Sequence, residues 1–314
     1  MKRFFPGAGV FTMVGALYTP GSGMTTSNGA APRTFWPATG VAAFAALLQR
    51  TATNLGRAVL VLGRPRRARP PRIDAVPFVA AAATIAAIMA SIYLLDAQAS
   101  EWARHLPQWL TDPADEITNF GLSSRFLYPI GIILLVLAAL MALSLPSMTR
   151  GLLAALFARF GFLFVAIGLP SLFDTVVKRM IGRARPYVGA HDNPLMFKPF
   201  IWLPEYASMP SGHATTATAA AVAIGAIWPR MRPVMWLYAL IIMATRVVIN
   251  VHHPSDVLGG ALVGVIGALM VRRWFAARRL VFFADDLRAY PGPSWQRLKA
   301  VVPSLLSRPS PAAE

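Results

Sequence analysis

The chain has 314 residues, of which 56% are hydrophobic and only 14% are charged, and its formal net charge at pH 7 is +17. Its long apolar runs exclude a pair of soluble domains, although the length alone would allow two. The positive charge does not indicate a nucleic-acid partner, because the arginines flank the apolar runs, as they do in cytoplasmic loops of membrane proteins. Cysteine is absent, which excludes disulfides, thiolate metal sites and a cysteine nucleophile.

The first predicted segment comprises residues 1–73. Residues 1–40 are rich in glycine, proline, serine and threonine, a composition that predicts disorder. Residues 41–62 place apolar side chains such as Phe44 and Leu55 on one helical face and Arg50 and Arg57 on the other. This pattern predicts a helix on the membrane surface, and a seventh, poor span is the alternative.

Residues 74–275 predict an all-α integral-membrane bundle of six transmembrane helices. Runs of about 20 apolar residues are long enough to cross a bilayer. The expected spans are 75–95, 126–146, 152–176, 213–229, 234–251 and 257–275. The remaining residues, 276–314, predict a partly helical cytoplasmic tail.

The distribution of Lys and Arg predicts how the spans are oriented. Ten of these residues precede the first span, and eight lie at the end of the sixth span and beyond it, counted from Arg272. The positive-inside rule therefore places both termini in the cytoplasm of a bacterial inner (plasma) membrane, with loops 96–125 and 177–212 on the periplasmic or outer face. Loop 177–212 carries five Lys and Arg residues against this rule. Either this loop contacts lipid phosphates as a basic surface loop, or its charges belong to a functional site.

Three polar motifs fall at span ends on this outer face. The stretch "KRMIGRARP" provides Lys178 and Arg185, and "TRVVINVHHPSD" provides Arg246. Cations beside an apolar medium need anionic partners, and the carboxylates nearby are few. Because guanidinium groups match phosphate oxygens as two-pronged donors, these three residues predict a bound phosphate group.

The third motif, "PSGH" at 210–213, precedes an apolar run. Ser211 suits the N-cap of a helix, and the first-turn amides near Ser211 and Gly212 would then bind an anion. Simple capping of a membrane helix explains this tetrapeptide equally well when it is taken alone.

In "HHPSD", Asp256 follows His252 by four residues and could orient its ring. The alternative is that Asp256 is only a first-turn acid near the helix dipole.

Together the motifs resemble the type 2 phosphatidic acid phosphatase superfamily, whose pattern is KxxxxxxRP, PSGH and SRxxxxxHxxxD. Lys178 with Arg185-Pro186 fits the first part, residues 210–213 fit the second, and Arg246, His252 and Asp256 fit the third. Thr245 stands where the pattern has serine, and it keeps the hydroxyl. The resemblance covers residues 170–275 in motifs and extends to about residue 75 in its span layout.

The resemblance implies a membrane lipid phosphate phosphatase that uses neither metal nor cofactor and forms a phosphohistidine. His252 would attack phosphorus, oriented by Asp256, and His213 would protonate the leaving group. Lys178, Arg185, Arg246 and the amides near Ser211 and Gly212 would hold the phosphate oxygens.

A polyprenyl diphosphate, phosphatidic acid, phosphatidylglycerol phosphate or a lipid A phosphate would suit such a site as substrate. The expected partners are this lipid and the bilayer, without nucleic acid, and the pattern does not predict an oligomeric state. A lipid phosphotransferase with the same intermediate and a non-enzymatic lipid-phosphate binder or transporter remain open.

Overall fold

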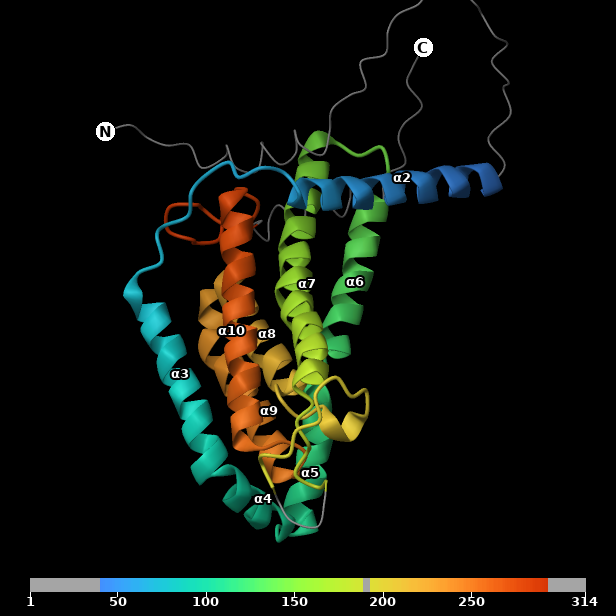
Figure 1. Cartoon of the computed structure of the whole chain (residues 1–314). Coiled ribbons are helices and arrows are strands. Elements are labelled where there is room, and N and C mark those ends of the chain that lie inside the picture. The colour runs from blue at the N-terminus through green and yellow to red at the C-terminus, as the bar shows by residue number, and fades with distance from the viewer. Residues whose placement is uncertain (1–39, 189–192, 293–314) are drawn as a thin grey trace, which may run out of the picture.

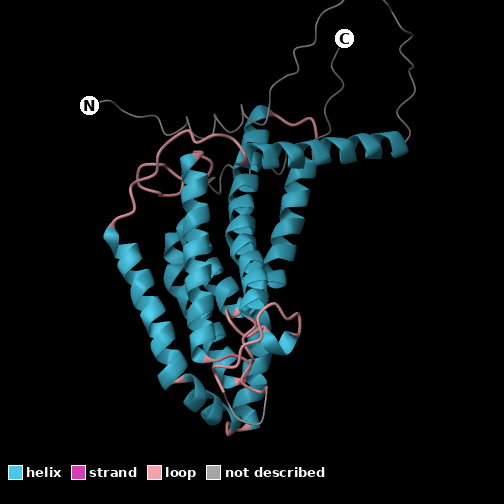
Figure 2. Ribbon diagram, viewed as in Figure 1, coloured by secondary structure: helices cyan, strands magenta, loops and turns pink. Residues whose placement is uncertain are grey.

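The computed structural model describes residues 40–188 and 193–292, and Figure 1 shows their arrangement. Within these ranges the protein is all-helical and has no strand (Figure 2). The predictions for residues 1–39 and for the tail beyond residue 292 fall outside the described residues. The helices run in the order α2 (Gly40–Leu62), α3 (Ala75–Leu94), α4 (Asp96–Arg104), α5 (Gln108–Thr118), α6 (Ser123–Leu140), α7 (Ser147–Ile181), α8 (Gly212–Ile227), α9 (Arg232–Val248) and α10 (Pro254–Ala277).

Five segments in the described ranges are long and apolar enough to cross a membrane, one fewer than the sequence predicts. They are α3, a segment at Gln108–Leu140 that joins α5 to α6, α7, a segment at Pro229–Val248 that includes α9, and α10. The predicted fourth span is α8, which has 16 residues and is therefore about 24 Å long. Twelve of those residues are buried, because α8 lies among α7, α9 and α10 at the centre of the bundle (Figure 1).

The helix boundaries also differ from the predicted ones. The second predicted span, 126–146, ends earlier, at Leu140. The third, 152–176, is a longer helix that runs from Ser147 to Ile181. Lys178 and Arg179 therefore belong to the last turn of α7 and not to a loop. Cations are favourable at this end of a helix because they face its negative dipole end.

Helix α2 confirms the helix predicted within residues 41–62. It lies across the end of the bundle where α6 and α7 are joined (Figure 1). It is absent from the candidate spans found in the described residues. Its exposed apolar side chains include Phe44 and Leu48. The location of this helix on the membrane surface stays a prediction.

Glycines of α10 let this helix approach its neighbours closely. A Cβ atom on Gly264 would lie 2.2 Å from Thr218 Oγ1 and 2.3 Å from the Thr215 carbonyl oxygen of α8. A Cβ atom on Gly267 would lie 2.5 Å from Pro170 Cγ of α7. These contacts leave no room for a larger side chain at either position, so the glycines allow α10 to pack closely on α7 and α8.

We expect Gly264→Val to destabilise the bundle, because its side chain would overlap backbone and side-chain atoms of α8. Overpacking of this kind typically costs about 1–3 kcal/mol. Thermal unfolding in detergent should therefore begin at a lower temperature. Gly161→Ala in α7 is the control, since a Cβ atom there would meet nothing within 4 Å. Equal melting temperatures for the two variants would contradict this account of the packing.

Candidate active site

Four helix ends meet at the end of the bundle opposite α2 (Figure 1). They are the C-terminal ends of α7 and α9 and the N-terminal ends of α8 and α10. The eight residues predicted for the site lie on these ends or on the short segments beside them. The structure therefore brings residues together that the sequence separates by up to 78 positions, from Lys178 to Asp256.

Lys178 lies one turn after Asp174 on α7, and its Nζ atom is 2.6 Å from Asp174 Oδ2. This ion pair lies directly against the start of α8, because a Cβ atom on Gly212 would be 3.0 Å from Lys178 Nζ and 3.1 Å from Asp174 Oδ2. Lys178 thus uses one of the few carboxylates near the three predicted phosphate-binding cations. Spacing of i and i+4 on one helix places the two side chains on the same face.

Helix α7 stops at Gly182, which has φ 63° and donates its N–H to the Lys178 carbonyl. A Cβ atom there would be 1.8 Å from the Lys198 carbonyl oxygen, so the return of the chain at 196–198 requires glycine. Beyond this turn, the Arg185 N–H donates to the Glu205 carbonyl at 2.8 Å. The loop after α7 is thus fixed by its own backbone, and it holds Arg185 in place.

Ser211 occupies the predicted N-cap position of α8, but its hydroxyl makes no capping hydrogen bond. Its backbone N–H instead donates to the Asp256 carbonyl at 2.9 Å, which ties the start of α8 to α10. The Ser211 side chain is fully buried, and its Oγ has no hydrogen-bond partner among the described residues. The capping explanation therefore does not account for the serine hydroxyl.

Two arginines of the predicted site also have a buried side-chain nitrogen without a hydrogen-bond partner. Arg185 Nε and Arg246 Nε are buried and have no hydrogen-bond partner among the described residues. Arg246 is otherwise held by α5, since its Nη1 donates to Thr118 Oγ1 at 2.8 Å. Buried donors without acceptors are costly, and an oxygen-rich anion would supply the acceptors that Ser211, Arg185 and Arg246 lack.

His252 lies in the short turn between α9 and α10 and is 4% exposed. Its Nδ1 atom is 3.8 Å from Asp256 Oδ2, which is too far for a hydrogen bond. Ser208 lies between them, because its hydroxyl donates to Asp256 Oδ2 at 2.6 Å and is 3.5 Å from His252 Nδ1. Asp256 is thus near His252 as predicted, but a serine hydroxyl that sequence analysis missed connects the two.

The second histidine, His213, lies in the first turn of α8. It is close enough to His252, Arg246, Lys178 and Arg185 for their charges to act on its ring. Gly121, between α5 and α6, is packed against it, since a Cβ atom there would be 3.0 Å from His213 Cδ2. The two imidazoles therefore share one cationic region.

The neighbouring histidine, His253, takes a different position. It is the N-cap residue of α10, and its N–H donates to Asp256 Oδ2 at 2.9 Å. Its Nδ1 atom is 3.1 Å from Ser100 Oγ of α4. His253 is 1% exposed, and these contacts fix it as a structural residue beside the site.

Arg183 is the largest buried residue that sequence analysis left unassigned. Its Nη1 atom is 2.6 Å from Asp256 Oδ1, and its Nη2 atom is 2.7 Å from Asp96 Oδ2 at the start of α4. All three side chains are completely buried. Ser255 completes the cluster, with its hydroxyl in contact with both Arg183 and Asp96. One guanidinium group thus joins α4 to the carboxylate that faces His252.

The remaining cations of the basic loop lie on aromatic rings. Arg179 is 5.7 Å from the centre of the Trp202 ring, and Lys198 is 4.8 Å from the centre of the Tyr206 ring. Cation–π contacts of this kind are attractive. Of the five cations in the predicted loop 177–212, three therefore lie in or beside the candidate site, and two contact aromatic rings of the same segment.

The environment of His252 shifts its pKa. Burial lowers this pKa to about 4, because desolvation penalises the imidazolium form. The Asp256 carboxylate opposes the shift, whereas the charges of Arg246 and Arg185 add to it. At neutral pH the ring is therefore neutral, with a lone pair on one nitrogen. Because Nδ1 faces Ser208 and Asp256, the other nitrogen, Nε2, is the one available to a ligand.

Comparison with known proteins identifies relatives of this chain. The PAP2 superfamily profile matches residues 159–280, which include all eight predicted site residues. The lipid A 1-phosphatase of Rhizobium johnstonii is 31% identical over 63% of this chain and 81% of its own length. The decaprenylphosphoryl-5-phosphoribose phosphatase of Mycobacterium tuberculosis is 33% identical over 43% of this chain and 68% of its own length.

Among solved structures, a transmembrane PAP2-type phosphatidylglycerolphosphate phosphatase from Bacillus subtilis matches 63% of this chain and 95% of its own chain. Its TM-score is 0.42 and its sequence identity is 24%. Sequence similarity shows the family of this chain, since the R. johnstonii enzyme is matched over more than two thirds of its length at more than 30% identity. The chain is a multi-pass membrane protein that belongs to the PAP2 superfamily.

Proposed function

We propose that this protein is a membrane lipid phosphate phosphatase that hydrolyses a phosphomonoester or diphosphate through a phosphohistidine. The observation that carries the proposal is the set of buried donors without acceptors, on Arg185, Ser211 and Arg246, beside two histidines. A phosphate group supplies the oxygens that these donors need. The same donors would stabilise the charge that develops on the equatorial oxygens during transfer.

The first step uses His252 as the nucleophile. Its Nε2 lone pair attacks phosphorus, and the bond between phosphorus and the leaving oxygen breaks. The proton on Nδ1 is held by Ser208, whose own proton points to Asp256 Oδ2. This chain stabilises the positive charge that forms on the ring as the phosphorus–nitrogen bond forms. Protonated His213 gives its proton to the leaving oxygen.

The second step returns the enzyme to its starting state. Neutral His213 accepts a proton from water, the water oxygen attacks phosphorus, and the bond to His252 Nε2 breaks. Inorganic phosphate leaves, and His213 is again protonated. Lys178, paired with Asp174, lies against the α8 amides and would bind one phosphate oxygen without bringing uncompensated charge into the site.

Lipid substrates suit the position of the site. Three of the four helices that carry it, α7, α9 and α10, belong to candidate membrane-spanning segments, and apolar side chains of the adjoining loop, including Phe200 and Trp202, are more than two thirds exposed. A phosphate group could enter while its lipid tail stays in the bilayer. Polyprenyl diphosphate, phosphatidic acid, phosphatidylglycerol phosphate and lipid A phosphate remain the candidates, and the R. johnstonii relative makes lipid A 1-phosphate the first to test.

The proposed location is a bacterial inner membrane, with the site at the periplasmic or outer face. The basic segment around residues 64–72, helix α2 and the connection between α6 and α7 lie at one end of the bundle, and the site lies at the other (Figure 1). The positive-inside rule favours the cytoplasm for the first end.

The deciding experiment measures phosphate release from a panel of these four lipid phosphates by the purified chain. We expect at least one to be hydrolysed, and we expect the rate to survive an excess of EDTA because the proposed mechanism uses only side chains. Complete loss with EDTA and recovery with magnesium would overturn metal independence. Release that requires a lipid or sugar hydroxyl acceptor would indicate the phosphotransferase, and tight binding without turnover would indicate a binder or transporter.

We expect a bell-shaped dependence of kcat/KM on pH, since His252 must be neutral and His213 protonated. The acid limb should lie near pH 4, where protonation of His252 removes its lone pair. Burial and then the charges of Arg246 and the other cations lower the pKa of His213 to about 3 in the free site, and the negative charge of a bound phosphate group would oppose this shift. The rate then falls again at higher pH, where His213 beside the bound phosphate loses the proton that it must donate. Initial rates from about pH 3 to pH 9 measure both limbs. A flat profile over this range would contradict the pairing of the two histidines.

A further inference from the structure

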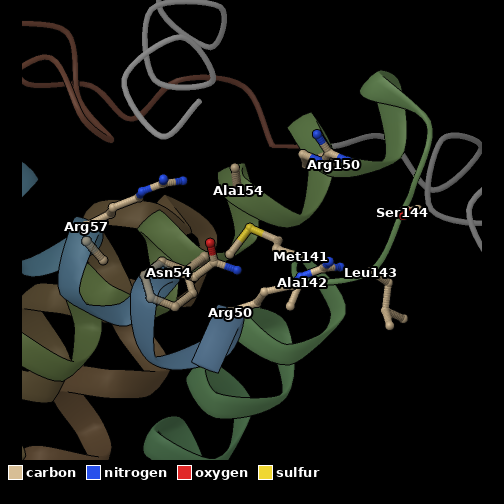
Figure 3. A pocket seen from close by; sticks show the side chains of 11 residues that line it. Arg50, Asn54, Arg57, Met141, Ala142, Leu143, Ser144, Arg150 and Ala154 are labelled. Atoms are coloured by element: carbon tan, nitrogen blue, oxygen red, sulfur yellow. The ribbon is translucent and has the colours of Figure 1, made fainter. Parts of the chain in front are cut away.

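A cationic pocket lies at the end of the bundle opposite the candidate active site. Its volume is about 380 Å³, and α2, the connection between α6 and α7, and α7 itself line it. Figure 3 shows Arg50 and Arg57 from α2 and Arg150 from α7 around this pocket. Among the described residues, its lining includes neither Asp nor Glu. This lining therefore offers arginine side chains to an anionic group.

The position of α2 preforms this pocket. Asn54 Nδ2 donates to the Ala138 carbonyl of α6 at 3.1 Å, which fixes the middle of α2 on the last turn of that helix. Arg50 and Arg57 are four residues before and three residues after Asn54, so all three lie on one face of α2. On the other side, Arg150 Nη2 donates to the Leu145 carbonyl at 3.3 Å. Both walls are thus held by hydrogen bonds within the protein.

An apolar cavity of about 320 Å³ adjoins the cationic pocket beneath α2. Side chains of α2, α6, α7 and α10 line it, among them Leu55, Leu134 and Phe275. Ala58 and Phe157 line both spaces. A molecule with an anionic head and an apolar tail matches this combination, because each part would meet a lining of its own kind.

We propose that α2, α6 and α7 form a binding site for an anionic phospholipid. The lipid phosphate lies among Arg50, Arg57 and Arg150, and an acyl chain enters the cavity next to Leu55. Anionic lipids are attracted to basic segments at the cytoplasmic surface. Exposed Phe44 and Leu48 place α2 at the depth where the headgroups lie. This site is separate from the proposed phosphatase site and does not depend on its chemistry.

The test uses the full chain in a neutral detergent and dioctanoyl phosphatidylglycerol as the probe, since this phosphodiester is neither a phosphomonoester nor a diphosphate and so is not a substrate of the proposed phosphatase. We expect this lipid to raise the melting temperature, and dioctanoyl phosphatidylcholine and inorganic phosphate to leave it unchanged. The double variant Arg50→Gln/Arg57→Gln should weaken phosphatidylglycerol binding about tenfold or more. Arg66→Gln/Arg69→Gln removes the same charge from the neighbouring basic segment, outside the pocket lining, and should bind normally.

A second variant tests the apolar part of the site. Gly161 lines the cavity, and a side chain there would enter open space. Gly161→Leu should therefore fold and should lose the response to phosphatidylglycerol. The proposal would be overturned if both lipids raised the melting temperature equally, or if inorganic phosphate raised it as much as phosphatidylglycerol does. Normal phosphatidylglycerol binding by either pocket variant would also overturn it. So would an unchanged melting temperature of the wild-type chain, as expected if another segment of this chain fills the pocket.

Discussion

His252→Ala is expected to lower phosphate release by about a thousand-fold or more, because it removes the proposed nucleophile. The ring is buried between Ser208 and the cationic region, so no other described imidazole can take its place without moving the helix ends. His253 is held by Ser100 and Asp256, and His213 belongs to the first turn of α8. The initial rate on the preferred lipid phosphate measures the loss.

The matched control is His105→Gln. His105 is an exposed histidine on the same end of the protein, with its Nδ1 atom 2.9 Å from the Glu101 carbonyl oxygen. This variant should keep the wild-type rate. A second readout follows the covalent intermediate with substrate that carries a radioactive phosphate group. The wild type and His105→Gln should retain a label that is labile in acid and stable in base, and His252→Ala should retain none. Wild-type turnover by His252→Ala would remove the phosphohistidine from the mechanism.

The parts of the site that sequence alone predicts are those marked by local patterns. Pro254 and the four-residue spacing of His252 and Asp256 mark the start of α10, and the serine and glycine of "PSGH" mark the start of α8. Apolar runs place these ends on one face of the membrane. Proximity in space then follows from topology, without any knowledge of side-chain contacts.

The missed parts depend on distance along the chain or on a helix boundary. Arg183 and Asp96 are 87 positions apart, and no local pattern connects them. Lys178 and Asp174 have the i, i+4 spacing of a helical ion pair. That pair is missed because the helix is predicted to end at residue 176. Helix α8 has nearly the predicted length but is largely buried inside the bundle, which the sequence did not indicate because small alanine and threonine side chains suit burial within a bundle as well as contact with lipid.

Arg183→Met is expected to have the second large effect, on both stability and turnover. It leaves two fully buried carboxylates, Asp96 and Asp256, without the cation they share. Breaking a buried ion pair from one side typically costs about 3–5 kcal/mol. We expect a markedly lower melting temperature in detergent. Lys198→Met is the control, because Lys198 is an exposed cation of the same loop, and it should melt nearly as the wild type does.

A compensating substitution separates the role of Arg183 in positioning Asp256 from its role in stability. Asp96→Asn removes one of the stranded carboxylates, so Arg183→Met/Asp96→Asn should regain part of the lost melting temperature. Turnover should stay low, because Asp256 has still lost the guanidinium group that holds it opposite Ser208 and His252. The loss should appear in kcat with little change in KM, since Arg185, Ser211 and Arg246 still bind phosphate. If the double variant recovers stability and kcat together, Arg183 stabilises the fold but does not position Asp256.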